Sequence, residues 1–282
     1  MSAFPRAVNR FTSVVRSHDV RPSATQGAQI VPVQNGYSTY ATVLGTPLSH
    51  DCYEIEIMVR EIAVSGQDTS SLTTIGVDRG GGTSFTDAIS HLLTGCAGKL
   101  SDSGSYGVRF RFPLFIPAGS TIGAKGSINN ATVGEQRIWV NCYGKPTHPE
   151  LVRVGRFVRT FGADTANSRG TALSLGTASE GAWTQVGTVA DPNLFAWVLS
   201  ATLVGLTTAS NTRTSLELGI GDGSNKREYI TDHEVAFGNN EALGQISIAQ
   251  PGECANGELI YVRGQAASAQ TTWSAIAYAV GG

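Results

Sequence analysis

Hydrophobic and polar residues alternate with a period of two along several short stretches of the chain. In the stretch 53–60, hydrophobic residues occupy the odd positions and mostly polar residues the even ones, and the stretch 108–112 (Val-Arg-Phe-Arg-Phe) alternates in the same way. Because successive side chains of a strand point to opposite faces, this pattern predicts strands with one buried and one solvated face. Such strands are typical of an antiparallel β-sandwich.

The same succession of strand-like segments occurs twice. In the first half these segments are 53–62, 71–78, 116–119 and 138–144, and in the second half they are 195–203, 215–222, 250–252 and 273–281. Sequence identity between the halves is low, so the repeat is one of pattern, and chance similarity between two sandwiches is the alternative. A duplicated β-domain without a duplicated catalytic motif favours scaffold or binding work over chemistry.

The composition agrees with two β-domains. The chain has 282 residues, a length that suggests about two domains, and 41% of the residues are hydrophobic, 15% are charged and 34 are Gly. Abundant Gly, Ser and Thr with few helix formers indicate an all-β protein. We therefore predict two tandem antiparallel β-sandwich (jelly-roll-like) domains over 39–146 and 171–282, an extended N-terminal arm over 1–38, and a linker over 147–170.

One segment of the first half has the spacing of a helix. Thr86 is a suitable N-cap, Gly95 a suitable end, and Ile89, Leu92 and Leu93 follow helical periodicity between them. The sequence therefore predicts a short helix over 86–95.

Positive charge is concentrated in the arm and the linker, although the net charge of the chain is -2. The overall balance argues against nucleic acid as a partner. A basic arm before a neutral-to-acidic body is typical of docking on an acidic protein surface, and a disordered leader is the equal alternative. The arginines that we expect at subunit contacts are Arg6, Arg10, Arg16, Arg21, Arg153, Arg156 and Arg159.

The sequence gives no sign of secretion, membrane insertion or zinc binding. The segment 4–15 lacks the apolar core of a signal peptide, and no run of 18 apolar residues indicates a membrane span. The four cysteines lie far apart and form no C-x-x-C pair, so we expect no zinc and no other cofactor. Cys52 and Cys142 fall on the first and last strands of the first domain, where free thiols are usual and a disulfide stays open.

Two groups of polar residues could carry chemistry, and each has a plainer interpretation. Glu54 and Glu56 share the polar face of one strand, within reach of sugar hydrolysis, but a polar strand face is the favoured interpretation. Asp222 and Asn225 could ligate calcium, but the EF-hand pattern is absent and a β-turn is favoured, as for Asp78.

The aromatic residues and the histidines give no clear catalytic signal. Trp139, Trp197 and Trp273 lie on predicted strands and are expected in the core, whereas Trp183 is the one tryptophan expected to be exposed for sugar stacking. The five histidines are scattered, and no catalytic motif is present. The residues themselves therefore predict no enzymatic activity.

The string 112–124 (Phe-Pro-Leu-Phe-Ile-Pro-Ala-Gly-Ser-Thr-Ile-Gly-Ala), which leads to Val140-Asn-Cys-Tyr-Gly144, resembles a module of structural proteins of tailed bacteriophages. The resemblance covers roughly residues 40–146, with a weaker echo toward the C-terminus. It implies a non-enzymatic virion component, made in the host bacterial cytoplasm, and brings no catalytic residues. It does not place the protein on the capsid as a decoration, or on the tail, the baseplate or a fibre.

Two hypotheses of different class follow. The first is a structural virion protein that assembles with other virion proteins and with copies of itself, as a trimer in a fibre or spike or else as a dimer, without binding a membrane. The second is a carbohydrate-binding or receptor-binding sandwich, or a glycan hydrolase, with a host-surface glycan as its ligand. The exposure of Glu54, Glu56 and Trp183 separates the two.

Overall fold

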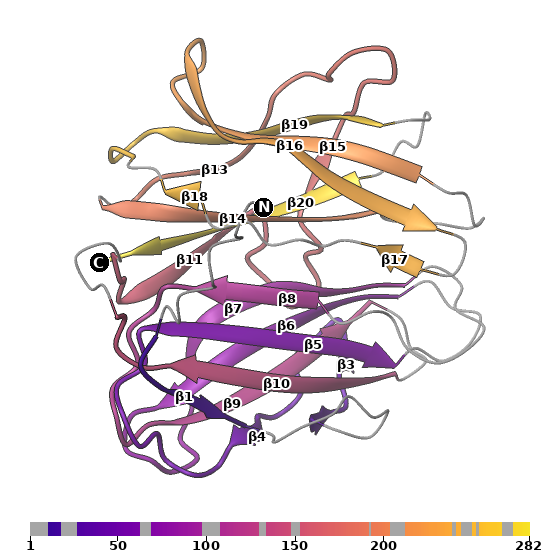
Figure 1. The fold of residues 1–282 in the computed structure, drawn as a ribbon. Coiled ribbons are helices and arrows are strands. Elements are labelled where there is room, and N and C mark those ends of the chain that lie inside the picture. The colour runs from indigo at the N-terminus through magenta and orange to yellow at the C-terminus, as the bar shows by residue number, and fades with distance from the viewer. Residues whose placement is uncertain are drawn as a thin grey trace, which may run out of the picture.

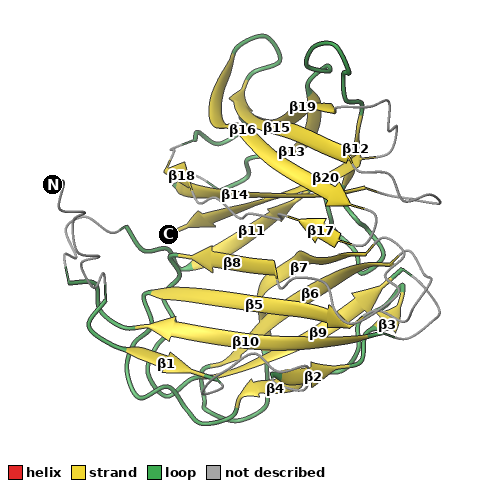
Figure 2. Ribbon diagram, turned by 45° about the vertical axis from the view of Figure 1, so that its right-hand side comes forward, coloured by secondary structure: helices red, strands yellow, loops and turns green. Residues whose placement is uncertain are grey.

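The computed structural model describes residues 11–17, 27–62, 69–97, 108–129, 134–147, 153–191, 193–203, 212–238, 241–243, 250–251, 254–266 and 273–282. Every regular element in these ranges is a β-strand, which confirms the predicted all-β class (Figure 2). The strands form four sheets in two sandwiches that lie one above the other (Figure 1). In the described part of the chain, no helix has the length and apolar character needed to span a membrane.

The first sandwich consists of two five-stranded sheets. One sheet contains β1 (Val14–Arg16), β2 (Ala28–Ile30), β5 (Glu54–Ile62), β8 (Val108–Phe112) and β10 (Glu135–Tyr143). The other contains β3 (Val33–Gln34), β4 (Ala41–Leu44), β6 (Thr69–Asp78), β7 (Thr86–Ala97) and β9 (Thr121–Ile128). The alternation predicted for 53–60 turns Ile55, Ile57 and Val59 into the core between the sheets, where all three are fully buried.

The second sandwich again consists of two five-stranded sheets. One contains β11 (Phe157–Phe161), β12 (Thr171–Leu173), β14 (Leu194–Leu203), β18 (Gln250–Pro251) and β20 (Trp273–Gly281). The other contains β13 (Thr184–Thr188), β15 (Thr212–Gly221), β16 (Lys226–Gly238), β17 (Glu241–Leu243) and β19 (Leu259–Ala266).

The predicted repeat is present in the topology and in the register. The strand order β1-β10-β5-β8 of the first sandwich recurs as β11-β20-β14-β18 in the second, and β9-β6-β7 recurs as β19-β15-β16. Ile30 of β2 is paired with Gln136, just as Leu173 of β12 is paired with Trp273. The residue before each of these short strands is a glycine with positive φ, Gly27 or Gly170, at +94° and +113°.

One tight turn recurs with its hydrogen bonds. In the first sandwich Gly119 (φ +84°) donates its N–H to the carbonyl of Leu48, 2.8 Å away, and in the second Gly257 (φ +86°) donates to Val189 at 2.8 Å. The counterpart of the turn at 116–119 is therefore the turn at Gly257. The segment 250–252, predicted as that counterpart, instead supplies edge strand β18, which has the position of β8.

The polar turns that follow β6 and β15 are Asx turns, as the sequence predicted. Asp78 accepts hydrogen bonds from the N–H groups of Gly80 and Ser84, both at 2.8 Å. Asp222 accepts from Ser224 and Asn225 at 2.8 and 2.6 Å. These backbone donors hold the pKa of both carboxyls below the ordinary value.

The predicted helix over 86–95 is wrong, because these residues form β7 along the edge of β6. The register shifts at a bulge, where His91 has a φ of +58°. An extra residue at a bulge changes which positions face the core. Ile89, Leu92 and Leu93 are consequently all fully buried, and their spacing imitates that of a helix.

The N-terminal stretch and the linker both contribute strands. Within the predicted arm, β1 and β2 pair with β10 and β3 pairs with β9, so the described part of the arm lies on its own sandwich. Within the predicted linker, β11 pairs with β20 as an edge strand of the second sandwich. The β-branched and aromatic residues of 157–161 (Phe-Val-Arg-Thr-Phe) favour a strand, which a simple linker would lack.

The sandwiches join through a face of the second and an edge of the first. Val158, Val198 and Val280, on the face formed by β11, β14 and β20, belong to the same buried cluster as the core of the first sandwich. Tyr278 of β20 reaches the bulge of β7, where its hydroxyl accepts the N–H of Leu93 and donates to the carbonyl of His91, each at 2.9 Å. Edge strand β7 is thereby capped by a side chain of the second sandwich.

The thiols of Cys52 and Cys142, whose bonding the sequence left open, are free and buried next to each other in the first core. Their mutual hydrogen bond, together with burial, raises the pKa of Cys142 well above its ordinary value. A thiol held neutral in this way packs as a small hydrophobic side chain.

Candidate functional site: the arginine face of the first sandwich

The sheet β1-β10-β5-β8 turns its outer face away from the core and gathers a group of polar side chains there. Glu56 lies near the centre of this face, between Arg111 on β8 and Asn141 on β10, which are its direct cross-strand neighbours. The sequence placed Glu54 and Glu56 on an exposed face, and that expectation is wrong. The two residues are only 3% and 2% exposed, and Glu56 is enclosed by side chains of the neighbouring strands.

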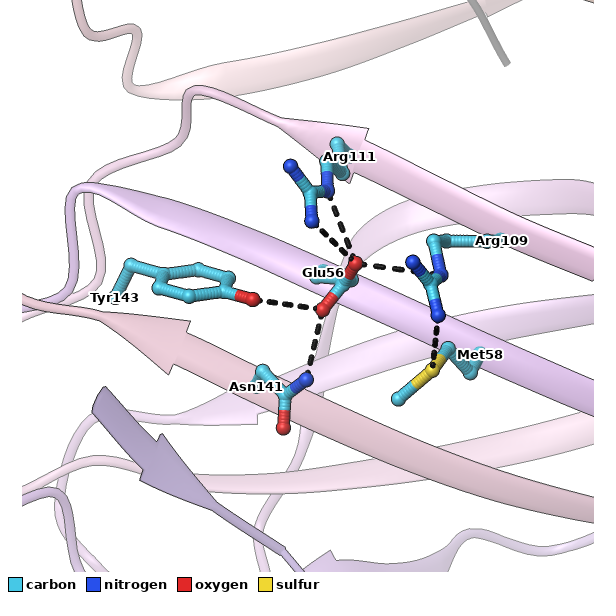
Figure 3. A network of polar contacts seen from close by, with 6 residues as sticks. All are labelled: Glu56, Met58, Arg109, Arg111, Asn141 and Tyr143. Carbon is cyan, nitrogen blue, oxygen red and sulfur yellow. Dashed lines mark hydrogen bonds and ion pairs between the residues drawn. The ribbon is translucent and has the colours of Figure 1, made fainter. Parts of the chain in front are cut away.

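Glu56 is held by donors from both neighbouring strands (Figure 3). Arg111 donates from Nε and Nη2 to Oε1 at 2.9 and 2.8 Å, and Arg109 lies 3.3 Å from the same oxygen. Asn141 Nδ2 and Tyr143 Oη donate to Oε2 at 2.7 and 2.8 Å. Both carboxylate oxygens are therefore engaged.

This arrangement fixes the ionisation of the site. Burial by itself would raise the pKa of Glu56, but the hydrogen bonds from Asn141, Tyr143 and Arg111 outweigh it and lower the pKa below the ordinary value. In return, the pKa of Arg111 is raised, because the hydrogen bond and charge of Glu56 outweigh burial. A carboxylate held ionised by several donors is a poor general acid and works instead as an anchor for cationic side chains.

The anchored arginines remain exposed at the surface of this face. The side chains of Arg109 and Arg111 remain 59% and 49% exposed, although both are oriented by Glu56. Tyr143 is braced from the other side by Phe11, whose ring centroid is 5.1 Å away. We call the outer side of β1, β5, β8 and β10, with Arg16, Arg109, Arg111, Asn141 and Tyr143, the arginine face.

The arginines predicted for assembly that the structure describes lie in two places. Arg16 is exposed on β1 within the arginine face. Arg153, Arg156 and Arg159 are all exposed at the junction of the sandwiches, where Arg153 stacks on Phe195 and Arg159 is bonded to Asp191. Arg6, Arg10 and Arg21 lie outside the described residues. The described arginines that we expected at subunit contacts therefore divide between two surfaces, the arginine face and the junction of the sandwiches.

The junction also contains a cavity of about 430 Å³. Its walls combine the guanidinium groups of Arg79, Arg156 and Arg159 with apolar side chains such as Leu114 and Phe115. Arg159 is committed to Asp191, with Nε 2.6 Å from Oδ2. Because Asp78 and Asp87 also line it, the cavity is a groove of mixed charge between the two sandwiches.

The aromatic residues mostly follow the core prediction. Trp197 and Trp273 are fully buried, as expected, whereas Trp139 is half-buried. Trp183, expected to be exposed for sugar stacking, is also half-buried, and the Arg263 guanidinium lies 4.4 Å from its ring centroid. Arg263 in turn bridges Glu217, Glu180 and Glu228 at 2.6, 2.7 and 3.0 Å. A ring covered in this way does not present a free stacking platform.

No group of three or more metal-ligating side chains occurs in the part of the chain that the structure describes. Asp222 uses its Oδ1 to accept the backbone N–H groups of its own turn, which supports the turn interpretation over a calcium loop.

The central residues of the site were missed at the level of sequence. The sequence pattern assigns Arg109 and Arg111 to the polar side of an alternating strand. It assigns Asn141 and Tyr143 only to the last strand of the first domain. Alternation assigned each residue to a face, but it did not show which strands are neighbours. The order β10-β5-β8, which no local pattern contains, brings these residues around Glu56.

Comparison with known proteins gives similarity of architecture only. No protein-family model matches the chain, and a search of curated proteins finds no significant match. Among solved structures, PNGF-II is 9% identical with a TM-score of 0.41, and the match covers 96% of this chain and 65% of PNGF-II. A structure of Sulfolobus Turreted Icosahedral Virus is 10% identical, with a TM-score of 0.40 and coverage of 95% and 90%.

Empty particles of cowpea mosaic virus supply a further similar chain, 9% identical, with a TM-score of 0.35 and coverage of 100% of this chain and 95% of that one. The similar structures include virus proteins alongside other proteins. Similarity this remote describes a shared β architecture, and the function must be argued from the site itself.

Proposed function

We propose that this chain is a non-enzymatic structural component of a tailed-bacteriophage particle and acts through protein–protein assembly. Its partners are copies of itself and other particle proteins, with no role for nucleic acid or a membrane. It is assembled in the cytoplasm of the host bacterium. The resemblance of residues 40–146 to tailed-phage modules motivates the class of particle.

The observation that carries the proposal is the use of Glu56. This carboxylate is 2% exposed and accepts hydrogen bonds from Arg111, Asn141 and Tyr143. Its negative charge therefore orients neighbouring side chains. The exposed guanidinium groups of Arg109 and Arg111 are oriented by Glu56. Oriented guanidinium groups suit the recognition of acidic protein surfaces. Two ordered sandwiches locked together by Tyr278 provide a stiff support for such a surface.

The glycan alternative has less support. It required the carboxylates of Glu54 and Glu56 and the ring of Trp183 to be accessible, whereas the carboxylates are buried and the ring lies beneath Arg263. Inverting and retaining glycosidases both need one carboxylic acid that can deliver a proton, and the lowered pKa of Glu56 opposes that role.

Mass spectrometry of purified phage particles, with immunogold labelling of a C-terminal tag, tests the proposal. We expect the protein at a fixed number of copies per particle, with label at one repeated position. Absence from washed particles would reject the structural role. Binding on a glycan array that is lost in Trp183→Ala but retained in Trp139→Ala would favour the alternative.

A further inference from the structure

The contact between the two sandwiches shows how one copy of this domain covers another. The face of the second sandwich that contains β11 and β20 lies against edge strand β7 of the first. In that contact Val158 is 8% exposed, and Thr160 Oγ1 donates to the carbonyl of Ser90 at 2.7 Å. Tyr278 completes the contact by hydrogen bonding at both sides of the bulge.

The repeat places an equivalent face on the first sandwich. Thr160 is the register partner of Tyr278, and in the first sandwich Arg16 is the partner of Asn141. Val14 of β1 therefore has the position of Val158. In contrast to Val158, it is 36% exposed and is one of the few large hydrophobic side chains at the surface. The arginine face is the first sandwich's version of the surface that the second sandwich buries.

The repeat also places an equivalent edge on the second sandwich. Strand β16 has the position of β7, and its bulge carries Asp232 with a φ of +52°, matching His91. Glu234 pairs with Ser215 as Leu93 pairs with Leu72, so Glu234 occupies the place of Leu93. Among the described residues, β17 pairs only with residues 236–238 of β16, beyond this bulge.

The two unfilled surfaces differ from the filled contact in charge, and they complement each other. Leu93 is fully buried within the filled contact, whereas Asp232 and Glu234 are both exposed. On the arginine face the residue in the place of Thr160 is Arg16, also exposed. Two acidic groups on the edge would therefore meet a cation on the face, with further positive charge from Arg109 and Arg111.

We propose that the arginine face binds the β16 edge of a second copy of this chain, in the geometry that joins the two sandwiches within one copy. Arg16 then lies beside Asp232 and Glu234 of the second copy, and Val14 is buried as Val158 is. The contact joins two different surfaces, so repetition closes into a ring if the rotation allows and otherwise extends as a filament. This inference rests on the proposed assembly function and names its partner surface.

A charge-exchange experiment on the full-length protein tests the contact. Arg16→Glu and Glu234→Lys are each expected to weaken self-association by about tenfold or more, because each sets like charges against each other. Mixing the two variants is expected to restore association, since the changed face of one then meets the changed edge of the other. Sedimentation velocity over a concentration series at low and high salt gives the readout, with thermal unfolding to confirm that each variant is folded.

The mixing step discriminates between models of association. A contact between identical faces predicts no recovery, and that result would overturn the proposal, as would a wild-type chain that stays monomeric throughout the series. If either charge variant unfolds, Arg16→Cys and Glu234→Cys are mixed instead. A disulfide linking position 16 of one copy to position 234 of another is then expected, and linkage only between like positions contradicts the proposal. The experiment is independent of particle composition, because association can fail in solution while mass spectrometry still finds the protein in particles.

Discussion

The same sheet meets opposite environments in the two halves of the molecule. Its outer face carries Val198 and Tyr278 in the second sandwich and is buried against the first. The corresponding positions of the first sandwich hold the polar residues Glu56 and Asn141, and there the face presents the exposed side chains of Arg109 and Arg111. The inner faces are apolar in both copies. The two sandwiches thus share their strand order and their inner core, and they differ in the outer face, which in the second sandwich packs against the first.

The largest effect is expected when a charged residue is placed on the buried outer face of the second sandwich. Val198→Glu is expected to destabilise the protein by about 4–5 kcal/mol, because Val198 is fully buried between the sandwiches and a carboxylate there would be desolvated without a designed partner. Chemical denaturation followed by circular dichroism measures the loss. Val198→Ala controls for packing alone and should cost less; equal losses would show that charge is not the cause.

The next effect separates the two tyrosines that lie on equivalent faces. Tyr278→Phe removes a hydroxyl that serves both Leu93 and His91 in a fully buried site, so a loss of about 1–3 kcal/mol is expected. Tyr143→Phe removes one hydrogen bond to Glu56 at a half-buried position and should cost less. A larger loss for Tyr143→Phe in denaturation experiments would contradict this account of the junction.

A pH titration tests the anchor of the arginine face. Glu56→Gln is expected to cost about 1–2 kcal/mol at neutral pH, because charge-assisted hydrogen bonds become neutral ones. The folded-state pKa of Glu56 is lowered from 4.5, so the stabilisation is complete above about that pH and is lost as the pH falls through the folded-state value. The stability gap between wild type and variant should therefore close in acid, and a gap that widens there would refute the prediction.

The last effect, no larger than that of Glu56→Gln, should be the same in both halves. Gly119 and Gly257 have φ values of +84° and +86°, and an added Cβ would meet nothing within 4 Å at either position. Gly119→Ala and Gly257→Ala should each cost about 1–2 kcal/mol, from the left-handed backbone alone. Thermal unfolding of the two variants would reveal unequal costs if the turns were not equivalent.

Period-two alternation, together with a composition rich in Gly, Ser and Thr, was enough to predict the all-β class, the inward faces of the strands and most of the repeat, although 250–252 was matched to the wrong element. It failed at β7, because the bulge at His91 breaks the period and produces helical spacing at 89, 92 and 93. It also misjudged Glu56, because exposure depends on the lengths of side chains from strands distant in sequence. Arg111 lies on β8 and Asn141 on β10, and only the folded sheet makes them neighbours of Glu56.

The capping of β7 by Tyr278 has a consequence in time. The hydroxyl of Tyr278 and the backbone of Leu93 are 185 positions apart in the chain, so the first sandwich cannot close its open edge until almost all of this sequence has been synthesised. Until then β7 offers unpaired backbone groups beside an apolar core, a state prone to pairing with the wrong strand. Docking of Tyr278, on the last strand of the second sandwich, is for that reason the step at which edge strand β7 of the first sandwich becomes protected from wrong pairing.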